Sequence, residues 1–318
     1  MDITRTTRTL HAADVLMIAF LGLLSLINLI FSARIPSWKV LILINVVVTA
    51  AIFLLAYTRY STGSRILAAL HDWYVPPAVF LSFKELYYMI RPLHLGQDYD
   101  GVLIAIDRWI FGVNPTEWIY QFAHPVLTEV LQIAYTSFFF LFLIVGAEFY
   151  RRGNRDLFNF FVFTCVYGFF LSYLGYFLVP AIGPRFTLHD FSALDSELPG
   201  LWLTPYLRWF VNAGESIPMG VTNALAIEGT QRDVFPSGHT MMMLVLMYFG
   251  VRYQLKTRHW LNVVGILLII ATVYQRYHYV VDLVAGATFM IFCISTAPGL
   301  YVTIKRRLQT IESRLPRA

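Results

Sequence analysis

The sequence predicts an all-α protein, a polytopic bundle of membrane-spanning helices, on three observations. Of its 318 residues, 58% are hydrophobic and 14% are charged, whereas soluble domains are usually about 45–50% apolar and about 25% charged. Apolar stretches close to the ~20 residues that cross a bilayer core recur along the chain. Aromatic residues make up 16% of the chain, and many stand at the ends of these stretches, as an interfacial belt requires.

About eight spans are expected, at residues 12–31, 38–57, 70–90, 127–150, 157–178, 238–254, 259–275 and 278–303. The first is interpreted as a retained span because its apolar run is too long for a signal peptide. Charges and tryptophans interrupt residues 92–126, and prolines and glycines interrupt residues 179–237. We expect both segments to lie at the membrane interface.

The expected division of the chain has three parts. Residues 1–69 form two extra N-terminal transmembrane helices, residues 70–304 form a six-helix core, and residues 305–318 form a basic cytoplasmic tail. Lys and Arg are more frequent on the segments that share a side with both termini. Because such residues favour the cytoplasmic side, we expect both termini in the cytoplasm and both interfacial segments on the periplasmic, extracellular or lumenal side.

Ionisable and small polar residues gather at the outer ends of the predicted spans. They are Lys84, Arg91, Arg185, Ser237, Gly238, His239, Arg276, His278 and Asp282. Charges beside membrane spans are costly and usually mark a functional site. Cations outnumber carboxylates in this set, so the expected ligand is an anion.

Two short stretches supply the chemistry for an anionic substrate. "PSGH", residues 236–239, precedes an apolar helix, so its free backbone N–H groups and the positive helix end suit a phosphate. In "HYVVD", His278 and Asp282 are four residues apart and share a helix face, so the carboxylate is expected to orient the imidazole. His278 is a candidate nucleophile and His239 a candidate general acid.

Plainer interpretations exist for several of these residues. The two histidines and Asp282 are also ligand types for zinc, but the nearby cations would repel a metal ion, and none is expected. His71, His124 and His189 are interpreted as ordinary interface residues. Asp98, Asp100 and Asp107 are expected either to form a solvated face or to contact a polar head group. Cys165 and Cys293 lie within apolar runs and are expected to be buried fillers.

Three motifs in order resemble the type 2 phosphatidic acid phosphatase superfamily. "KELYYMIRP", residues 84–92, is similar to its first motif, "PSGH" to its second, and "HYVVD" to the end of its third. The resemblance covers about residues 70–300. It implies a six-helix phosphatase-like core and metal-independent phosphoryl transfer. His278 would take the phosphoryl group, Asp282 would orient it, and His239 would act as the acid.

The resemblance also implies the phosphate ligands, with one departure from the superfamily. By similarity, Lys84, Arg91, Ser237 and Gly238 would bind phosphate. The third motif usually has an arginine six residues before its histidine, where this chain has Thr272. Arg185 or Arg276 is the expected substitute. "YHYVVDLVAG" and "PAIGPR" are more similar to the branch of inositol phosphorylceramide synthases and sphingomyelin synthases.

The expected function is therefore phosphoryl transfer on a lipid phosphate in a membrane, without a cofactor. Water as acceptor would give a lipid phosphatase, and a hydroxyl group would give a head-group phosphotransferase; the residues favour neither. The rival is a lipid or anion transporter, or a scramblase, with the charged cluster as its pathway. It predicts internal repeats, and the sequence shows none. The expected partners are lipid phosphates and membrane lipids and no nucleic acid, and nothing predicts the oligomeric state.

Overall fold

The structure is a computed structural model that describes residues 10–218 and 220–314, with side chains to residue 310. The basic residues Arg5, Arg8 and Arg317 therefore lie outside the described residues. Within that part of the chain the regular structure is helical, with no strand. Two compact units form: unit 1 comprises residues 1–93, 154–170 and 293–318, and unit 2 comprises residues 94–153 and 171–292.

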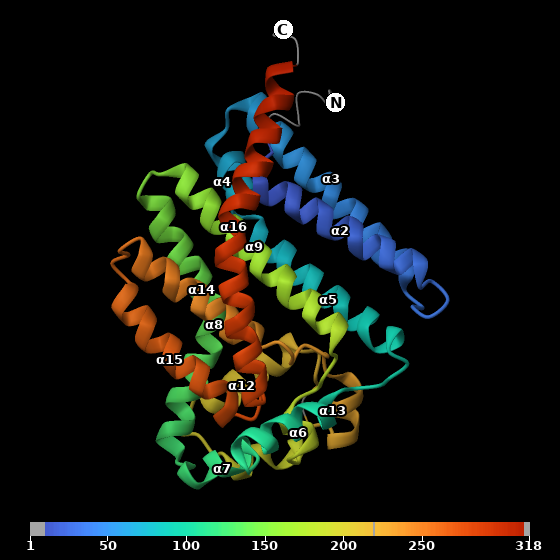
Figure 1. The fold of residues 1–318 in the computed structure, drawn as a ribbon, viewed down its shortest axis with the longest axis vertical. Coiled ribbons are helices and arrows are strands. Elements are labelled where there is room, and N and C mark those ends of the chain that lie inside the picture. The colour runs from blue at the N-terminus through green and yellow to red at the C-terminus, as the bar shows by residue number, and fades with distance from the viewer. Residues whose placement is uncertain (1–9, 219, 315–318) are drawn as a thin grey trace. The chain divides into compact units, whose positions relative to one another are not determined.

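Unit 1 begins with the helices of the N-terminal third, which are labelled in Figure 1. They are α2 (Ala12–Ile30), α3 (Trp38–Thr62), α4 (Arg65–Trp73) and α5 (Val75–Leu93). Parts of two long helices, α9 (Arg155–Leu178) and α16 (Val280–Arg314), complete the unit. Cys165 and Cys293 are buried and free, as the sequence predicted.

A buried carboxyl in α5 explains why the least apolar predicted span still forms. Glu85 is 5% exposed, and its Oε1 accepts hydrogen bonds from Nδ2 of Asn28 (2.8 Å) and of Asn45 (2.9 Å). Burying an unpaired carboxyl is expensive. The two amides from α2 and α3 offset this cost and fasten the three helices to one another.

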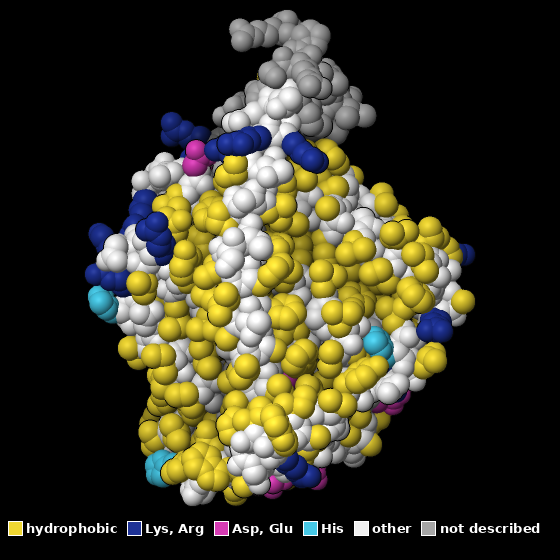
Figure 2. All heavy atoms as spheres, in the orientation of Figure 1, with side chains coloured by type: hydrophobic (Ala, Val, Ile, Leu, Met, Phe, Trp, Pro, Cys, Tyr) yellow, Lys and Arg dark blue, Asp and Glu magenta, His cyan; other side chains and the backbone are white. Residues whose placement is uncertain are grey.

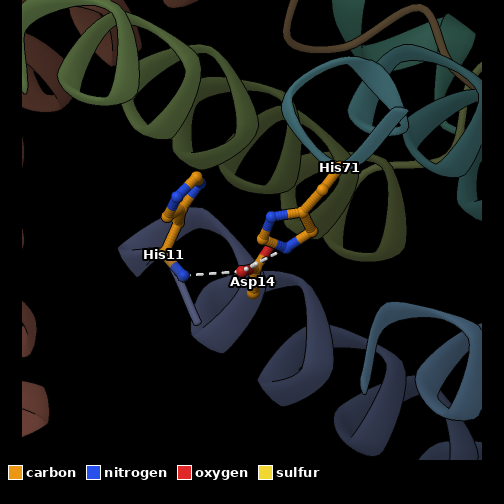
Figure 3. Close-up of side chains that lie close together, drawn as sticks. All are labelled: His11, Asp14 and His71. Atoms are coloured by element: carbon orange, nitrogen blue, oxygen red, sulfur yellow. Dashed lines mark hydrogen bonds and ion pairs between the residues drawn. The ribbon is translucent and has the colours of Figure 1, made fainter. Parts of the chain in front are cut away.

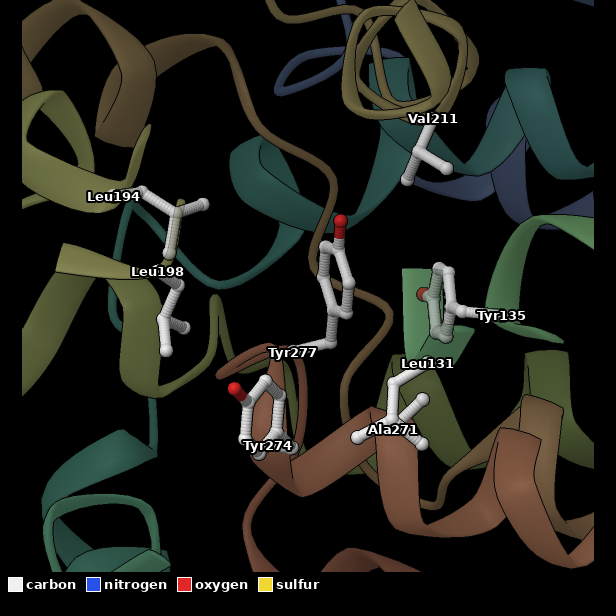
Figure 4. Close-up of a cluster of buried hydrophobic side chains, with 8 residues drawn as sticks. All are labelled: Leu131, Tyr135, Leu194, Leu198, Val211, Ala271, Tyr274 and Tyr277. Atoms are coloured by element: carbon white, nitrogen blue, oxygen red, sulfur yellow. The ribbon is translucent and has the colours of Figure 1, made fainter. Parts of the chain in front are cut away.

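Unit 2 contains many short helices and three longer ones. They are α6 (Asp100–Phe111), α7 (Pro115–Ile119), α8 (Pro125–Arg151), α10 (Pro184–Thr187), α11 (Leu194–Glu197), α12 (Thr204–Gly214), α13 (Asn223–Gly229), α14 (Gly238–Arg252) and α15 (Arg258–Tyr274). Helix α8 packs against α12, α14 and α15. Figure 4 shows the resulting core, in which Leu131 and Tyr135 of α8 lie near Ala271 and Tyr274 of α15.

The prediction of eight spans is wrong for the described residues, in which six helices are long and apolar enough to cross a membrane. They are Ala12–Ile30, Trp38–Thr62, Arg65–Leu93, Pro125–Arg151, Arg155–Leu178 and Val280–Thr310. The predicted spans 238–254 and 259–275 became helices of 15 and 17 residues. At about 1.5 Å per residue, such helices fall short of a ~30 Å hydrocarbon core.

The surface agrees with a protein that contacts lipid. Hydrophobic side chains cover most of the face seen in Figure 2. Leu26, Val40 and Leu43 of unit 1 are each more than half exposed, and an extended exposed apolar surface marks a region that contacts lipid or another protein. Together with the six candidate spans, this surface indicates an integral membrane protein.

Helix α6 lies within the predicted interfacial segment 92–126, and it exposes an apolar side chain while it buries its acidic ones. Its apolar Trp109 is 85% exposed, while Asp100 and Asp107 are 5% and 2% exposed. The solvated face predicted for these two aspartates is therefore wrong. Asp98 pairs with Arg232 at 3.2 Å. The acidic side of α6 faces the interior of unit 2, where it holds the loops of the candidate site.

Candidate active site

The "PSGH" turn forms the N-terminus of α14, as its sequence predicts. Ser237 is the N-cap residue, and its Oγ accepts a hydrogen bond from the backbone N–H of Thr240 at 3.2 Å. The backbone N–H of Ser237 donates to the carbonyl oxygen of Asp282 at 3.0 Å. The turn is thereby fastened to the first turn of α16, so the second and third motifs lie side by side in unit 2.

Gly238 is required at this turn for steric reasons. A Cβ atom at this position would lie 2.3 Å from the hydroxyl oxygen of Tyr176, far inside ordinary van der Waals contact. Glycine therefore lets the first turn of α14 approach α9 closely. The N–H groups of Ser237, Gly238 and Thr240 already meet Asp282, Tyr176 and Ser237, so what this helix start offers an anion is the positive end of the α14 dipole.

His278 lies between α15 and α16 and is 4% exposed. Its Nδ1 is 3.0 Å from the carbonyl oxygen of Val234, so Nδ1 carries the proton that it donates there, and Nε2 carries a lone pair. Burial lowers the pKa of His278 to about 4, although the charge of Asp233 and the Val234 carbonyl act in the opposite direction. The imidazole is therefore neutral at neutral pH, as a nucleophile must be.

Asp282 is fully buried in the first turn of α16, and its Oδ2 is 3.5 Å from Nδ1 of His278. The same oxygen accepts a hydrogen bond from the backbone N–H of Tyr279 at 2.8 Å, which makes Asp282 a cap of the helix. The closest acceptor for His278 is thus the Val234 carbonyl. The orienting role of Asp282 stays a prediction, and its Oδ1 has no hydrogen-bond partner.

The ring of His239 lies 5.8 Å from the ring of His278, centroid to centroid. It packs between Tyr135 (4.6 Å) and Phe138 (4.4 Å) of α8. Burial, helped by the charges of His278 and Arg185, lowers the pKa of His239. A proton on this ring is therefore costly unless an anion is bound beside it, which links the acid role predicted for His239 to substrate binding.

The two candidate substitute arginines have different environments. Arg185, 4% exposed, lies over the ring of Tyr277 at 4.8 Å, and its charge lowers the pKa of both His239 and His278. The charge of Arg276 instead lowers the pKa of His189. Arg185 is therefore the arginine that acts on both histidines.

Carboxylates pair with both arginines, which the sequence did not predict. Arg185 pairs with Glu215, and Arg276 pairs with Glu197. The Nε atom of each arginine is buried without a hydrogen-bond partner. Because an unmet donor on a buried cation is costly, each guanidinium retains capacity for a further acceptor such as a phosphate oxygen. The sequence predicted more cations than carboxylates at the site. This prediction is wrong for Arg185 and Arg276, because each is paired with a carboxylate.

Two aspartates of α6 hold the loops that carry Arg185 and His278. Asp100 accepts hydrogen bonds from the backbone N–H groups of Ile182 (3.0 Å) and Gly183 (2.8 Å). Asp107 accepts from the N–H groups of Val280 and Val281 at 2.8 and 2.9 Å, at the start of α16. Sequence reasoning missed these positioning residues, because nothing in their spacing indicates which loop they meet.

Lys84 and Arg91 of the first motif lie on α5, which belongs to unit 1, whereas the residues above belong to unit 2. Their seven-residue separation puts them close to two helical turns apart, so both can lie on one face of α5. Their role as phosphate ligands stays a prediction.

These features define a class of protein: an all-helical membrane protein with a neutral, buried imidazole beside the N-terminus of a glycine-containing helix. The chain belongs to the PAP2 superfamily, which matches residues 102–296. Membership implies an enzyme of phosphatase or phosphotransferase type that acts on lipid phosphates. The matched region contains both histidines, Asp282 and both arginines, whereas Lys84 and Arg91 precede it. No curated protein and no solved structure matches the chain.

Proposed function

We propose that the chain transfers the phosphoryl group of a lipid phosphate through a phosphohistidine on His278. The observation that carries this proposal is the state of the imidazole. Its Nδ1–H is engaged by the Val234 carbonyl, so the remaining lone pair is on Nε2, and burial keeps the ring neutral. A neutral imidazole with a fixed tautomer is a competent nucleophile.

In the first step, Nε2 of His278 attacks phosphorus while the bond from phosphorus to the lipid oxygen breaks. The departing oxygen takes a proton from His239, whose ring lies 5.8 Å from that of His278. The arriving phosphate compensates the cost of protonating His239 in its aromatic pocket. Arg185 and the positive end of α14 at Ser237 and Gly238 are the proposed phosphate-binding groups in unit 2, and Arg276 is a further candidate.

In the second step, His239 takes a proton from the acceptor, the acceptor oxygen attacks phosphorus, and Nε2 of His278 leaves. Water as acceptor releases inorganic phosphate. A lipid hydroxyl forms a new phospholipid, as in the inositol phosphorylceramide synthase and sphingomyelin synthase branch. "YHYVVDLVAG" and "PAIGPR" resemble that branch, and the choice between water and a hydroxyl is an outcome of the experiment below.

The proposed orientation has both termini in the cytoplasm and the site on the opposite side, which the distribution of Lys and Arg supports. Cysteine labelling tests it, because both native cysteines are buried. Trp109→Cys, at a residue that is 85% exposed, should react with an impermeant maleimide added from outside. Asp156→Cys, at a side chain that is 75% exposed in the first turn of α9, should react only after permeabilisation, because α8 and α9 are both candidate spans. The reverse pattern would refute the orientation.

The function is tested with phosphatidic acid carrying a radiolabelled phosphate. Wild type should yield labelled protein, and then either inorganic phosphate or, when a lipid alcohol is supplied, a new labelled lipid. His278→Ala should give no labelled protein. His239→Ala should slow labelling and turnover, and His259→Ala, an exposed histidine of α15, should behave as wild type. Unchanged turnover in His278→Ala would refute the phosphohistidine, and lipid movement without phosphoryl transfer would favour a transporter.

A further inference from the structure

A second cluster of histidine and aspartate lies in unit 1 and contains none of the residues discussed above as the candidate site. His11 caps α2, Asp14 lies in the first turn of α2, and His71 lies in α4 (Figure 3). Asp14 and His71 are each 1% exposed, so His71 is not the interface residue that the sequence predicted. The three residues offer ligand atoms that lie within 4.8 Å of one another.

Arg59, near the end of α3, fixes the protonation of both imidazoles. Its Nη1 lies 3.2 Å from Nε2 of His11 and 3.1 Å from Nδ1 of His71. Since a guanidinium only donates hydrogen bonds, both ring nitrogens direct lone pairs at it. The other nitrogen of His71, Nε2, is 3.0 Å from Oδ2 of Asp14 and therefore carries the proton.

More hydrogen-bond acceptors surround Nη1 of Arg59 than this nitrogen has protons to donate. Oδ1 of Asp72 lies 2.8 Å away and is the third acceptor around this nitrogen, which carries only two protons. Two imidazole lone pairs and a carboxylate oxygen thus converge on one positively charged atom. This is a donor set that borderline transition-metal ions such as Zn²⁺ prefer.

Asp14 holds His71, one of these potential metal ligands, in place by a hydrogen bond. It accepts the N–H of His71, the hydroxyl of Tyr74 at 2.7 Å and the backbone N–H of His11 at 2.6 Å. A carboxylate that accepts the second N–H of a ligating histidine fixes its tautomer and raises its basicity. The arrangement therefore has both ligands and an orienting carboxylate.

We propose that this cluster binds a divalent transition-metal ion, zinc being the best match. His11 Nε2, His71 Nδ1 and Asp72 would be its ligands, and Asp14 would orient His71. The metal takes the place of the Arg59 guanidinium, whose side chain is 29% exposed and so has a path to solvent. The three ligand atoms lie 2.8–3.2 Å from Nη1 and would move to about 2.0–2.2 Å from a zinc ion. The bound metal would thereby link α2 to α4.

Zinc binding to the full-length protein in detergent tests the proposal. Chelator-treated wild type is titrated with zinc chloride, and the bound metal is measured by mass spectrometry after desalting. Wild type should bind one zinc per chain. Arg59→Gln removes the cation that occupies the proposed metal position, while Arg155 still pairs with the other oxygen of Asp72 at 2.9 Å; the variant should bind zinc at least about tenfold more tightly. His71→Ala and Asp72→Ala should lose it, while His259→Ala should not differ from wild type.

The Arg59→Gln variant keeps the test decisive if His71→Ala fails to fold, provided that its melting curve shows a cooperative transition, because unfolded Cys and His side chains also bind zinc. A second measurement is the thermal midpoint, which zinc should raise in wild type and not in a folded Asp72→Ala variant. The proposal is overturned if wild type and Arg59→Gln hold no more zinc than the double variant His11→Ala/His71→Ala. It is also overturned if His259→Ala loses as much zinc as His71→Ala.

Discussion

Replacing Gly238 tests whether the close approach of α9 to the start of α14 builds the site. In Gly238→Ala, the new Cβ would lie 2.3 Å from the hydroxyl oxygen of Tyr176, but 3.6 Å from Cζ and 3.7 Å from Oγ of Ser172. The hydroxyl is therefore the single obstacle. Overpacking of this kind costs about 1–3 kcal/mol, and the helix end must shift, so turnover should fall with stability.

Removing the hydroxyl of Tyr176 should restore the stability lost in Gly238→Ala. Tyr176→Phe alone should cost about 1 kcal/mol for the lost hydroxyl interactions. The double variant Tyr176→Phe/Gly238→Ala leaves the Cβ in ordinary contact with the ring, so its stability should equal that of Tyr176→Phe. The two substitutions should then couple by about 1–3 kcal/mol.

The assay is thermal unfolding in detergent together with phosphate release from phosphatidic acid. Gly101→Ala is the matched control, because a Cβ there meets nothing within 4 Å; it should leave both readings unchanged or slightly raise stability. If Gly238→Ala melts as wild type does, or if the two losses simply add in the double variant, the steric reasoning is wrong.

Three further predictions concern the surroundings of His278. Because the folded imidazole has a pKa of about 4 and the unfolded one about 6.5, His278 should contribute a fall in stability of about 3 kcal/mol as pH drops from 6.5 to 4. His239 and His189, whose pKa burial also lowers, add to the total fall; melting curves from pH 4 to 8 measure it, and His278→Asn should make it smaller by about 3 kcal/mol. Arg185→Ala should lower kcat/KM by roughly 100-fold and Arg276→Ala by much less, since only the charge of Arg185 acts on both histidines. Asp107→Asn should lower the thermal midpoint, because an amide places a donor against one of the two N–H groups that begin α16, at a cost of about 1–3 kcal/mol.

Each of these predictions has a clear contrary result. A pH profile with the same fall in His278→Asn would place the titration on another group. Equal losses in Arg185→Ala and Arg276→Ala would remove the distinction between the two arginines. An Asp107→Asn variant that melts as wild type does would show that the loop before α16 does not depend on α6.

Much of the fold was predictable, because the apolar stretches that span a bilayer are local in sequence. The helices α2, α3, α8 and α9 lie close to their predicted bounds. The count of spans was wrong because hydropathy does not tell how far a helix extends. The stretches at 238–254 and 259–275 end early, at Arg252 and Tyr274.

The sequence by itself determined the membrane class and the residue types of the site, because the glycine-containing helix start and the histidine four residues before a carboxylate are short local patterns. Only the tertiary structure decided which groups act on those residues. The Val234 carbonyl fixes the proton on His278, carboxylates pair with Arg185 and Arg276, and aspartates of α6 hold both loops. These partners are tens of residues away from the groups they meet, and hydrogen bonds over such separations depend on how helices pack, which no local pattern records.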